Sequence, residues 1–302
     1  MLPRLESLLL LSLLVAPCAA VLSMGCSSPP CQKILALHGG GMTASSFRDM
    51  PGIQDFMDRA GPSYEFVFAD GPYGGSAGRL WIKDPPGGKG QVTTDPSFDE
   101  ESTAVLDGIV ESEGPFYGIL GYSQGTAATL SYLSIAPPGT FQIAMTFCSY
   151  VPTTHQGITE RIEAAAPYSI PMYVYMSTLD FIITNCMTNE FAALFESPTR
   201  ATNDDGSAGL TGHAPPLEGA QGFEELASFL GADHGDGSYT PPAVRAIEEE
   251  DAGCPSSVDI LLSLFWWVIL ILVLLLLLSC FCCYCCCCRR KRKAELAPAT
   301  TH

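Results

Sequence analysis

The chain has 302 residues, 47% of them hydrophobic, and its 32 acidic residues outnumber its 15 basic ones for a formal charge of −17. This composition excludes a disordered or collagen-like chain, and the length suits one large domain or two small ones. Most of the acidic residues lie between Lys33 and Asp251. This part of the chain would repel phosphate backbones, so no nucleic-acid partner is expected.

The N-terminus has the pattern of a secretory signal peptide. Arg4 precedes an apolar run from Leu8 to Ala16, and small residues follow up to Ala20. This order predicts a signal peptide over residues 1–20 that is cleaved near Ala20. An uncleaved anchor and an apolar N-terminal strand are the alternatives.

A second apolar segment lies near the C-terminus, over residues 258–279, and Asp259 is its one charged residue. At about 1.5 Å per residue it predicts a transmembrane helix that covers a bilayer core of about 30 Å. Five consecutive basic residues, 289–293, follow it and favour the cytoplasmic side. We therefore expect a single-pass type I membrane protein, with its body extracellular or luminal, an acidic stalk over 235–257 and a cytoplasmic tail over 280–302.

The cysteines fall into two groups. On the outer side, disulfides can form among Cys26, Cys31, Cys148, Cys186 and Cys254, and the odd number leaves at least one unpaired within the chain. The other group borders the predicted helix on its cytoplasmic side, where thiols are typical S-palmitoylation sites; the alternative is that they merely extend the apolar helix. Its members are Cys280, Cys282, Cys283, Cys285, Cys286, Cys287 and Cys288.

Residues 31–234 alternate short apolar runs with helical patterns, which predicts an α/β domain whose mostly parallel sheet is covered by helices on both faces. The stretch from Tyr73 to Thr94 is rich in Gly and Pro and is expected to be a long loop. The expected strands are Ile34–Leu37, Tyr64–Ala69, Phe116–Leu120, Ile143–Phe147 and Met172–Met176. The expected helices are Phe47–Arg59, Phe98–Ser112, Gln124–Leu133, Ile158–Ala166, Asn189–Glu196 and Phe223–Leu230.

The sharpest motif is Gly121-Tyr122-Ser123-Gln124-Gly125, between an expected strand and an expected helix. A G-x-S-x-G sequence in this context is typical of a nucleophile elbow, in which flanking glycines allow a tight turn that exposes the serine. The N-terminus of the helix favours negative charge beside it. Ser123 is therefore the predicted nucleophile.

Acyl transfer also needs hydrogen-bond donors for the oxyanion. The amide of Gln124 can supply one donor, and the second is expected from the His38-Gly39-Gly40-Gly41 loop after an early strand. We predict the Gly40 amide, with Gly41 as the alternative. His38 is expected to brace this loop.

The acid and the base should follow the serine in that order. Asp180 comes after an expected strand and is the predicted acid, since Asp204 lies in a polar loop. His213 precedes the last expected helix and is the predicted base, with His234 as the alternative.

These segments resemble the FSH-type serine hydrolases, small members of the α/β-hydrolase superfamily, over nearly all of residues 32–230. Residues 114–125, Gly-Pro-Phe-Tyr-Gly-Ile-Leu-Gly-Tyr-Ser-Gln-Gly, are similar to a characteristic segment of that family. Also similar are Leu37-His38-Gly39, Asp70-Gly71-Pro72 and the Gly-His-x-x-Pro at 212–216. The resemblance implies an α/β-hydrolase fold with Ser123 as nucleophile, Asp180 as acid and His213 as base. After Asp180, where the family often has Val-Pro, this chain has Phe181-Ile182-Ile183-Thr184.

The expected function is hydrolysis of a small-molecule or lipid acyl ester or thioester through an acyl-enzyme, with no metal or organic cofactor. Activity should fall at acidic pH because the histidine base becomes protonated. Two alternatives stay open: a catalytically inactive hydrolase fold used as a binding or adhesion ectodomain, and a lipase or phospholipase. A lipase would need a large apolar lid, and the Gly/Pro-rich stretch has few apolar residues.

Overall fold

The computed structural model describes residues 21–23, 31–75, 78–204, 206, 212–234 and 265–274. These fall into two units that divide after Arg245. The predicted signal peptide, stalk, palmitoylation cysteines and cytoplasmic tail lie outside the described residues. The first unit holds the motifs singled out in the sequence, from His38 to His213.

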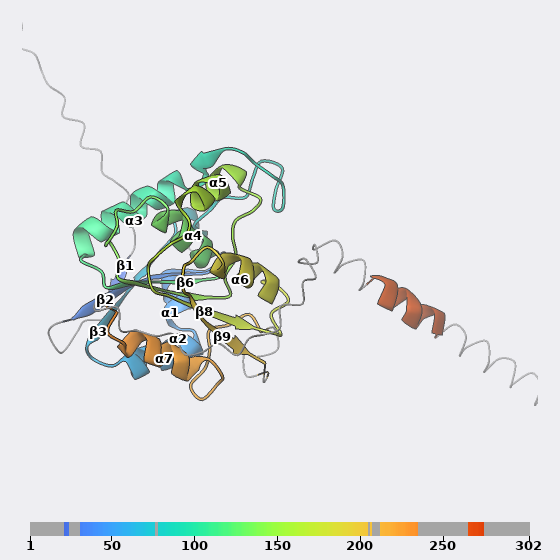
Figure 1. The fold of residues 1–302 in the computed structure, drawn as a ribbon. Coiled ribbons are helices and arrows are strands. Elements are labelled where there is room, and N and C mark those ends of the chain that lie inside the picture. Colours follow the sequence, from blue (N-terminus) through green and yellow to red (C-terminus); the bar gives the residue numbers. More distant parts are fainter. Residues whose placement is uncertain are drawn as a thin grey trace, which may run out of the picture. The chain divides into compact units, whose positions relative to one another are not determined.

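The first unit is built on a seven-stranded sheet in the order β1-β3-β2-β6-β7-β8-β9 (Figure 1). All neighbouring strands are parallel except β1, which pairs antiparallel with β3. Parallel strands need crossover connections, and the helices between them supply these. The strands are β1 (Val21–Ser23), β2 (Gln32–Leu37), β3 (Tyr64–Ala69), β6 (Gly118–Tyr122), β7 (Ile143–Phe147), β8 (Met172–Ser177) and β9 (Thr199–Asn203).

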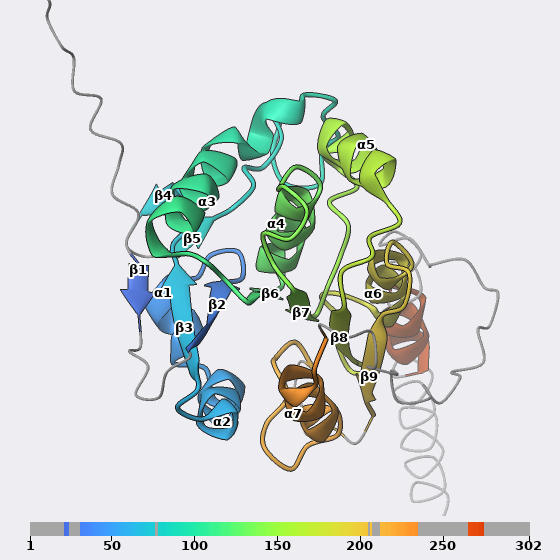
Figure 2. The same cartoon turned by 60° about the vertical axis from the view of Figure 1, so that its left-hand side comes forward.

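Helices cover both faces of this sheet, with α3, α4, α5 and α6 on one side and α1, α2 and α7 on the other (Figure 2). A 3₁₀ turn, Pro96–Asp99, leads into α3. The bounds are α1 (Ala44–Arg48), α2 (Pro51–Ala60), α3 (Glu100–Glu113), α4 (Gln124–Leu133), α5 (Gln156–Ala165), α6 (Asn185–Ala192) and α7 (Phe223–Gly231).

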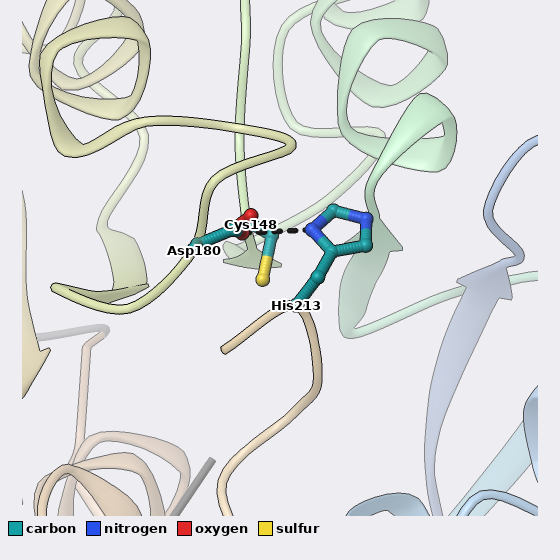
Figure 3. A group of neighbouring side chains, drawn as sticks. All are labelled: Cys148, Asp180 and His213. Atoms are coloured by element: carbon teal, nitrogen blue, oxygen red, sulfur yellow. Dashed lines mark hydrogen bonds and ion pairs between the residues drawn. The ribbon is translucent and has the colours of Figure 1, made fainter. Parts of the chain in front are cut away.

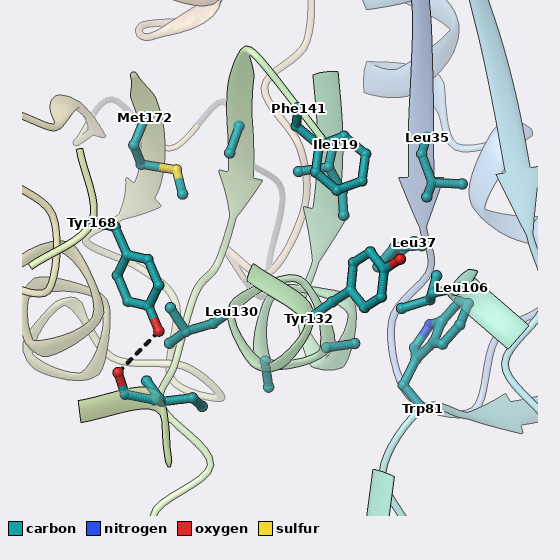
Figure 4. Close-up of a cluster of buried hydrophobic side chains, with 14 of the residues drawn as sticks. Leu35, Leu37, Trp81, Leu106, Ile119, Leu130, Tyr132, Phe141, Tyr168 and Met172 are labelled. Carbon is teal, nitrogen blue, oxygen red and sulfur yellow. Dashed lines mark hydrogen bonds between the residues drawn. The ribbon is translucent and has the colours of Figure 1, made fainter. Parts of the chain in front are cut away.

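Each face of the sheet has its own hydrophobic core. Successive residues of a strand point to opposite faces, and β2 shows this directly: Leu35 and Leu37 join the core under α3 and α4, whereas Ile34 and Ala36 join the core under α2 and α7. Figure 4 shows the first core, where Leu35, Leu37 and Ile119 face the helix that carries Leu130 and Tyr132. Burial on both faces explains why the central strands are mostly apolar.

The expected elements are largely confirmed, although the helix expected over Asn189–Glu196 lies at Asn185–Ala192. Three further corrections follow from the structure. The helix expected over Phe47–Arg59 is two helices, α1 and α2, because Pro51 begins a new helix at its first turn. The edge strand β9 was not expected, because its sequence, Thr-Arg-Ala-Thr-Asn, is polar and contains no apolar run. The loop expected from Tyr73 to Thr94 begins with a two-stranded hairpin, formed by β4 (Tyr73–Gly75) and β5 (Gly78–Leu80).

In the second unit the described residues, 265–274, are helical, and all of their large hydrophobic side chains except that of Ile269 are exposed. They lie inside the segment predicted to span a membrane. Within the parts of the chain that the structure describes, no helix is both long and apolar enough to cross a bilayer.

Candidate active site

Ser123 lies in the sharp turn between β6 and α4. Its backbone has φ 50° and ψ −118°, a conformation that a residue with a side chain rarely adopts. The turn is held by two backbone hydrogen bonds, from the Ser123 amide to the Phe147 carbonyl (3.0 Å) and from the Thr126 amide to the Ser123 carbonyl (2.9 Å). Strain of this kind persists where the surroundings fix it, and here it presents the hydroxyl at the carboxyl edge of the sheet.

The two glycines of the motif are required by close packing around this turn. A Cβ on Gly125 would lie 2.2 Å from the Leu37 carbonyl oxygen, and one on Gly121 would lie 2.7 Å from the Gly125 carbonyl oxygen. Real Cβ atoms do not approach backbone oxygens this closely. The glycines therefore let the first turn of α4 pack directly on the end of β2.

Ser123, His213 and Asp180 form a continuous chain of hydrogen bonds. The Nε2 atom of His213 lies 3.0 Å from the Ser123 Oγ, and its Nδ1 lies 2.7 Å from the Asp180 Oδ2. The Asp180 side chain is 1% exposed and that of His213 is 10% exposed. Three loops that are distant in sequence thus bring together the residues expected to act as nucleophile, base and acid.

The orientation of Asp180 is fixed from its own loop. Its Oδ1 accepts hydrogen bonds from the amides of Ile182 (2.9 Å) and Ile183 (2.8 Å), which leaves Oδ2 for His213. With Oδ1 held by two backbone amides, Oδ2 is placed to accept the imidazole Nδ1–H. This pattern selects the histidine tautomer whose Nε2 is free to accept a proton from Ser123.

The backbone of the His213 loop is anchored as well. The Tyr122 hydroxyl donates to the His213 carbonyl at 2.8 Å, and the two rings lie 5.2 Å apart. Burial raises the pKa of Tyr122, so the phenol stays protonated as the donor. Gly212 has φ 64°, and a Cβ there would lie 2.4 Å from the Asp180 amide nitrogen. The histidine and acid loops therefore pack backbone to backbone.

The two expected oxyanion donors lie beside each other. A Cβ on Gly40 would contact the Gln124 side chain at 3.4 Å. Gln124 is the first residue of α4, so its N–H has no acceptor within the helix. The alternative donor, the Gly41 amide, is already committed to the Arg79 carbonyl at 2.8 Å. Gly41 is therefore the less suitable of the two loop amides, and Gly40 stays the predicted donor.

The β4–β5 hairpin supports the loop of residues 38–41, which we call the oxyanion loop. The glycine-rich sequence did not indicate this role. Besides the Gly41 bond, the Arg79 amide donates to the Met42 carbonyl at 2.8 Å. Just after the hairpin, the Gln124 side chain accepts from the Trp81 amide (2.9 Å) and donates to the Ile82 carbonyl (3.0 Å). The side chain of Gln124 thus ties this segment to the elbow.

The other histidines that the structure describes lie outside this chain of bonds. His38 is fully buried beneath the oxyanion loop, where its Nε2 accepts from the Gly71 amide and its Nδ1 donates to the Gly39 carbonyl. Burial lowers the pKa of His38, which is consistent with its expected bracing role. His155 bonds the Lys83 carbonyl, and His234 bonds the Phe229 carbonyl behind α7, so neither takes the place of His213.

Cys148 also lies beside these residues, although no motif of the sequence indicated it. It follows β7 in a left-handed conformation (φ 55°), is 1% exposed, and its sulfur lies within 4.8 Å of the ligand atoms of Asp180 and His213 (Figure 3). Burial, followed by the charge of Asp180, raises the pKa of its thiol, so the sulfur is an unreactive neutral group. Thiolate, carboxylate and imidazole together could ligate zinc, but a metal would have to break the Asp180–His213 hydrogen bond.

The structure describes three of the five cysteines expected on the outer side. Cys31 and Cys186 are each disulfide-bonded, whereas Cys148 is free. Cys26 and Cys254 lie outside the described residues.

Several known esterases are similar to this chain. The chain is 38% identical over 104 residues to the esterase alnB of Emericella nidulans, a match that covers 33% of this chain and 36% of that relative's length. Among solved structures, the esterase PE8 has a TM-score of 0.51 at 16% identity, covering 70% of this chain and 97% of that one. A Bacillus cereus carboxylesterase has a TM-score of 0.51 at 14% identity, covering 71% and 94%.

The two solved structures establish the fold, which is the α/β-hydrolase fold with a mostly parallel sheet. The family is established separately, since the model described as "Serine hydrolase (FSH1)" matches residues 27–206, more than half of the chain. The chain therefore belongs to the FSH1 family of serine hydrolases.

Proposed function

We propose that the chain hydrolyses carboxylic esters or thioesters through an acyl-enzyme. The observation that carries the proposal is the hydrogen-bond chain from Ser123 through His213 to Asp180, at 3.0 and 2.7 Å. A serine on a strained elbow, a correctly oriented imidazole and a buried carboxylate together have no evident use in a binding module.

In the first half-reaction the Ser123 Oγ attacks the substrate carbonyl while His213 Nε2 accepts the hydroxyl proton. The Gly40 and Gln124 amides donate to the oxyanion that forms. His213 then gives its proton to the leaving alcohol or thiol as the carbonyl–oxygen or carbonyl–sulfur bond breaks. The acyl group remains on Ser123.

In the second half-reaction a water molecule attacks the acyl-enzyme, and His213 takes one proton from it. The same two amides hold the second oxyanion. Collapse of this intermediate returns the proton to the Ser123 Oγ and releases the carboxylic acid. Asp180 keeps its hydrogen bond to His213 Nδ1 and stabilises the imidazolium that forms in each half-reaction.

Ser123→Ala should abolish labelling by a fluorophosphonate probe and lower kcat by at least about 10⁴-fold, because the nucleophile is missing. Wild type and variant are compared by circular dichroism and by gel fluorescence of the labelled protein. A folded wild type that does not react with the probe would leave a non-catalytic binding ectodomain as the better account.

The Asp180→Asn variant tests whether Asp180 fixes the tautomer of His213. The asparagine oxygen would accept the Ile182 and Ile183 amides, so its NH₂ group would face His213 Nδ1. The ring proton would then move to Nε2, which could no longer accept the Ser123 proton, and kcat should fall about 10⁴-fold. The pH dependence of kcat/KM should change in the same variant, whereas a decrease below tenfold would contradict a role for Asp180 as the acid.

We also propose that a C-terminal helix over residues 258–279 tethers the enzyme to a membrane, with the catalytic unit on the outer side. Support comes from the apolar run followed by five basic residues, and from the disulfide bonds of Cys31 and Cys186, which suit an oxidising compartment. The expected result is that alkaline carbonate fails to extract the full chain but releases a chain ending at residue 257. Extraction of the full chain would disprove the anchor.

A further inference from the structure

The loop that carries Asp180 exposes an unusual group of apolar side chains. Leu179 is 48% exposed, Phe181 70% and Ile182 51%. In the described part of the first unit six large hydrophobic residues are exposed, and these three fall within four consecutive positions. Single exposed apolar residues need no explanation, but a cluster beside a reactive centre indicates a binding surface. We call these three side chains the acid-loop rim.

The rim is held rigidly relative to the catalytic groups. The Ile182 and Ile183 amides donate to the same carboxylate that orients His213, and the Asp180 amide donates to the Ser177 carbonyl at 3.1 Å. Ile183 is 8% exposed and fixes the far end of the loop in the core. The side chains of Phe181 and Ile182 therefore project from a backbone that cannot move without moving Asp180.

The position of the acid-loop rim indicates that it contacts the leaving group of the substrate rather than the acyl group. The oxyanion donors come from the Gly40 loop and the start of α4, whereas the acid loop lies behind the imidazole, on the side of His213 away from Ser123. In the mechanism above, His213 Nε2 must reach the leaving-group atom to protonate it. The leaving group is thus the part of the substrate that His213 contacts, and the acid loop is hydrogen-bonded to that histidine.

We propose that the acid-loop rim binds the alkyl chain of the alcohol or thiol that leaves, which makes the enzyme selective for esters of apolar alcohols. This inference rests on the proposed function and adds a substrate class to it. The alkyl chain extends past His213 and packs on Phe181 and Ile182, while the acyl group stays on Ser123. Burial of one methylene contributes up to about 0.8 kcal/mol, so kcat/KM should rise roughly two- to fourfold per carbon of the alcohol.

The test uses two series of esters. One joins acetate to linear alcohols from methanol to octanol, and the other joins methanol to linear acids from acetate to octanoate. The quantity measured is the slope of log(kcat/KM) against chain length, for wild type, Phe181→Ser and the Phe181→Ser/Ile182→Ser double variant. We expect the slope of the alcohol series to fall by at least half in the double variant and the slope of the acyl series to stay as in wild type.

Ile135→Ser is the matched control. Ile135 is 43% exposed and follows the C-terminal end of α4, at the edge of the sheet opposite Ser123. Losing an equivalent apolar surface there should change neither slope. If Ile135→Ser lowers the alcohol slope as much as Phe181→Ser does, general surface hydrophobicity is responsible and the proposal is wrong.

Other results would also overturn the proposal in recognisable ways. A lower slope in the acyl series alone would assign the rim to the acyl chain. Equal slopes in all variants, with loss of sedimentation with phosphatidylcholine vesicles, would make the rim a lipid-contacting surface. Absence of both esterase activity and fluorophosphonate labelling in wild type would instead refute the proposed function itself.

If a variant loses activity altogether, a binding measurement still tests whether the rim binds the alcohol chain. Free 1-octanol, as a product analogue, should protect Ser123 of the wild type from fluorophosphonate labelling at lower concentration than it protects the Phe181→Ser variant. Octanoate should protect the two proteins equally. Equal protection by octanol would contradict binding of the alcohol chain at the rim.

Discussion

At the scale of single residues, buried polar groups with fully specified partners decide how the site behaves. His38 shows this best, since it contacts no reacting atom but links the oxyanion loop to the Gly71 turn through both ring nitrogens. Desolvation lowers its pKa in the folded state. The unfolded chain therefore binds a proton more readily than the folded one between the two pKa values, and stability falls as the pH drops below about 6.5.

Replacement of His38 by Gln should weaken this pH dependence, because the amide can keep one donor and one acceptor but does not titrate. The free energy of unfolding is measured by urea titration from pH 5 to 7.5, and the steepest slope contributed by one such group is about 1.4 kcal/mol per pH unit. We expect a shallower slope for His38→Gln than for wild type. An unchanged slope would mean that the buried imidazole does not contribute to acid sensitivity.

At the scale of elements, the first turn of α4 contacts the end of β2 through a glycine rather than through side chains. Gly125→Ala would place its Cβ 2.2 Å from the Leu37 carbonyl oxygen, so the helix must shift and carry Ser123 with it. We expect a loss of at least ~2 kcal/mol in the free energy of unfolding and slower probe labelling.

Gly108 in α3 offers the matched control, since a Cβ there would meet nothing within 4 Å. Gly108→Ala should stabilise the protein by up to ~1 kcal/mol, because alanine is the better helix former. The two glycine variants should thus shift the thermal midpoint in opposite directions. Equal effects would show that the contact between α4 and β2 is not the reason for Gly125.

At the scale of the whole molecule, the accessibility of Cys148 and the disulfide bonds report on global folding. Cys148 is buried in the core with a raised pKa, while Cys31 and Cys186 are disulfide-bonded. Iodoacetamide should therefore modify Cys148 only when urea unfolds the chain, as read from the mass of its peptide. Reduction should lower stability by about 2–4 kcal/mol per essential disulfide. Rapid modification of Cys148 in the native protein would contradict its burial.

The sequence by itself determined the alternation of strands and helices and the local chemistry. The runs that became β2, β3, β7 and β8 are mostly apolar because both faces of a parallel sheet are buried. Ser123 could be found because an elbow needs glycines at fixed spacing, and a downstream order of acid and base pointed to Asp180 and His213. Local signals were sufficient wherever local geometry imposes the residue type.

Only the tertiary structure decided the relations between distant segments. It brought His213 within 3.0 Å of Ser123, committed the Gly41 amide to the Arg79 carbonyl, and placed Cys148 beside the acid. It also showed that Phe181 and Ile182 are exposed at the site, although their sequence reads like a core strand. The physical reason is that these contacts arise from packing between loops far apart in the chain, and no local pattern encodes which loops will meet.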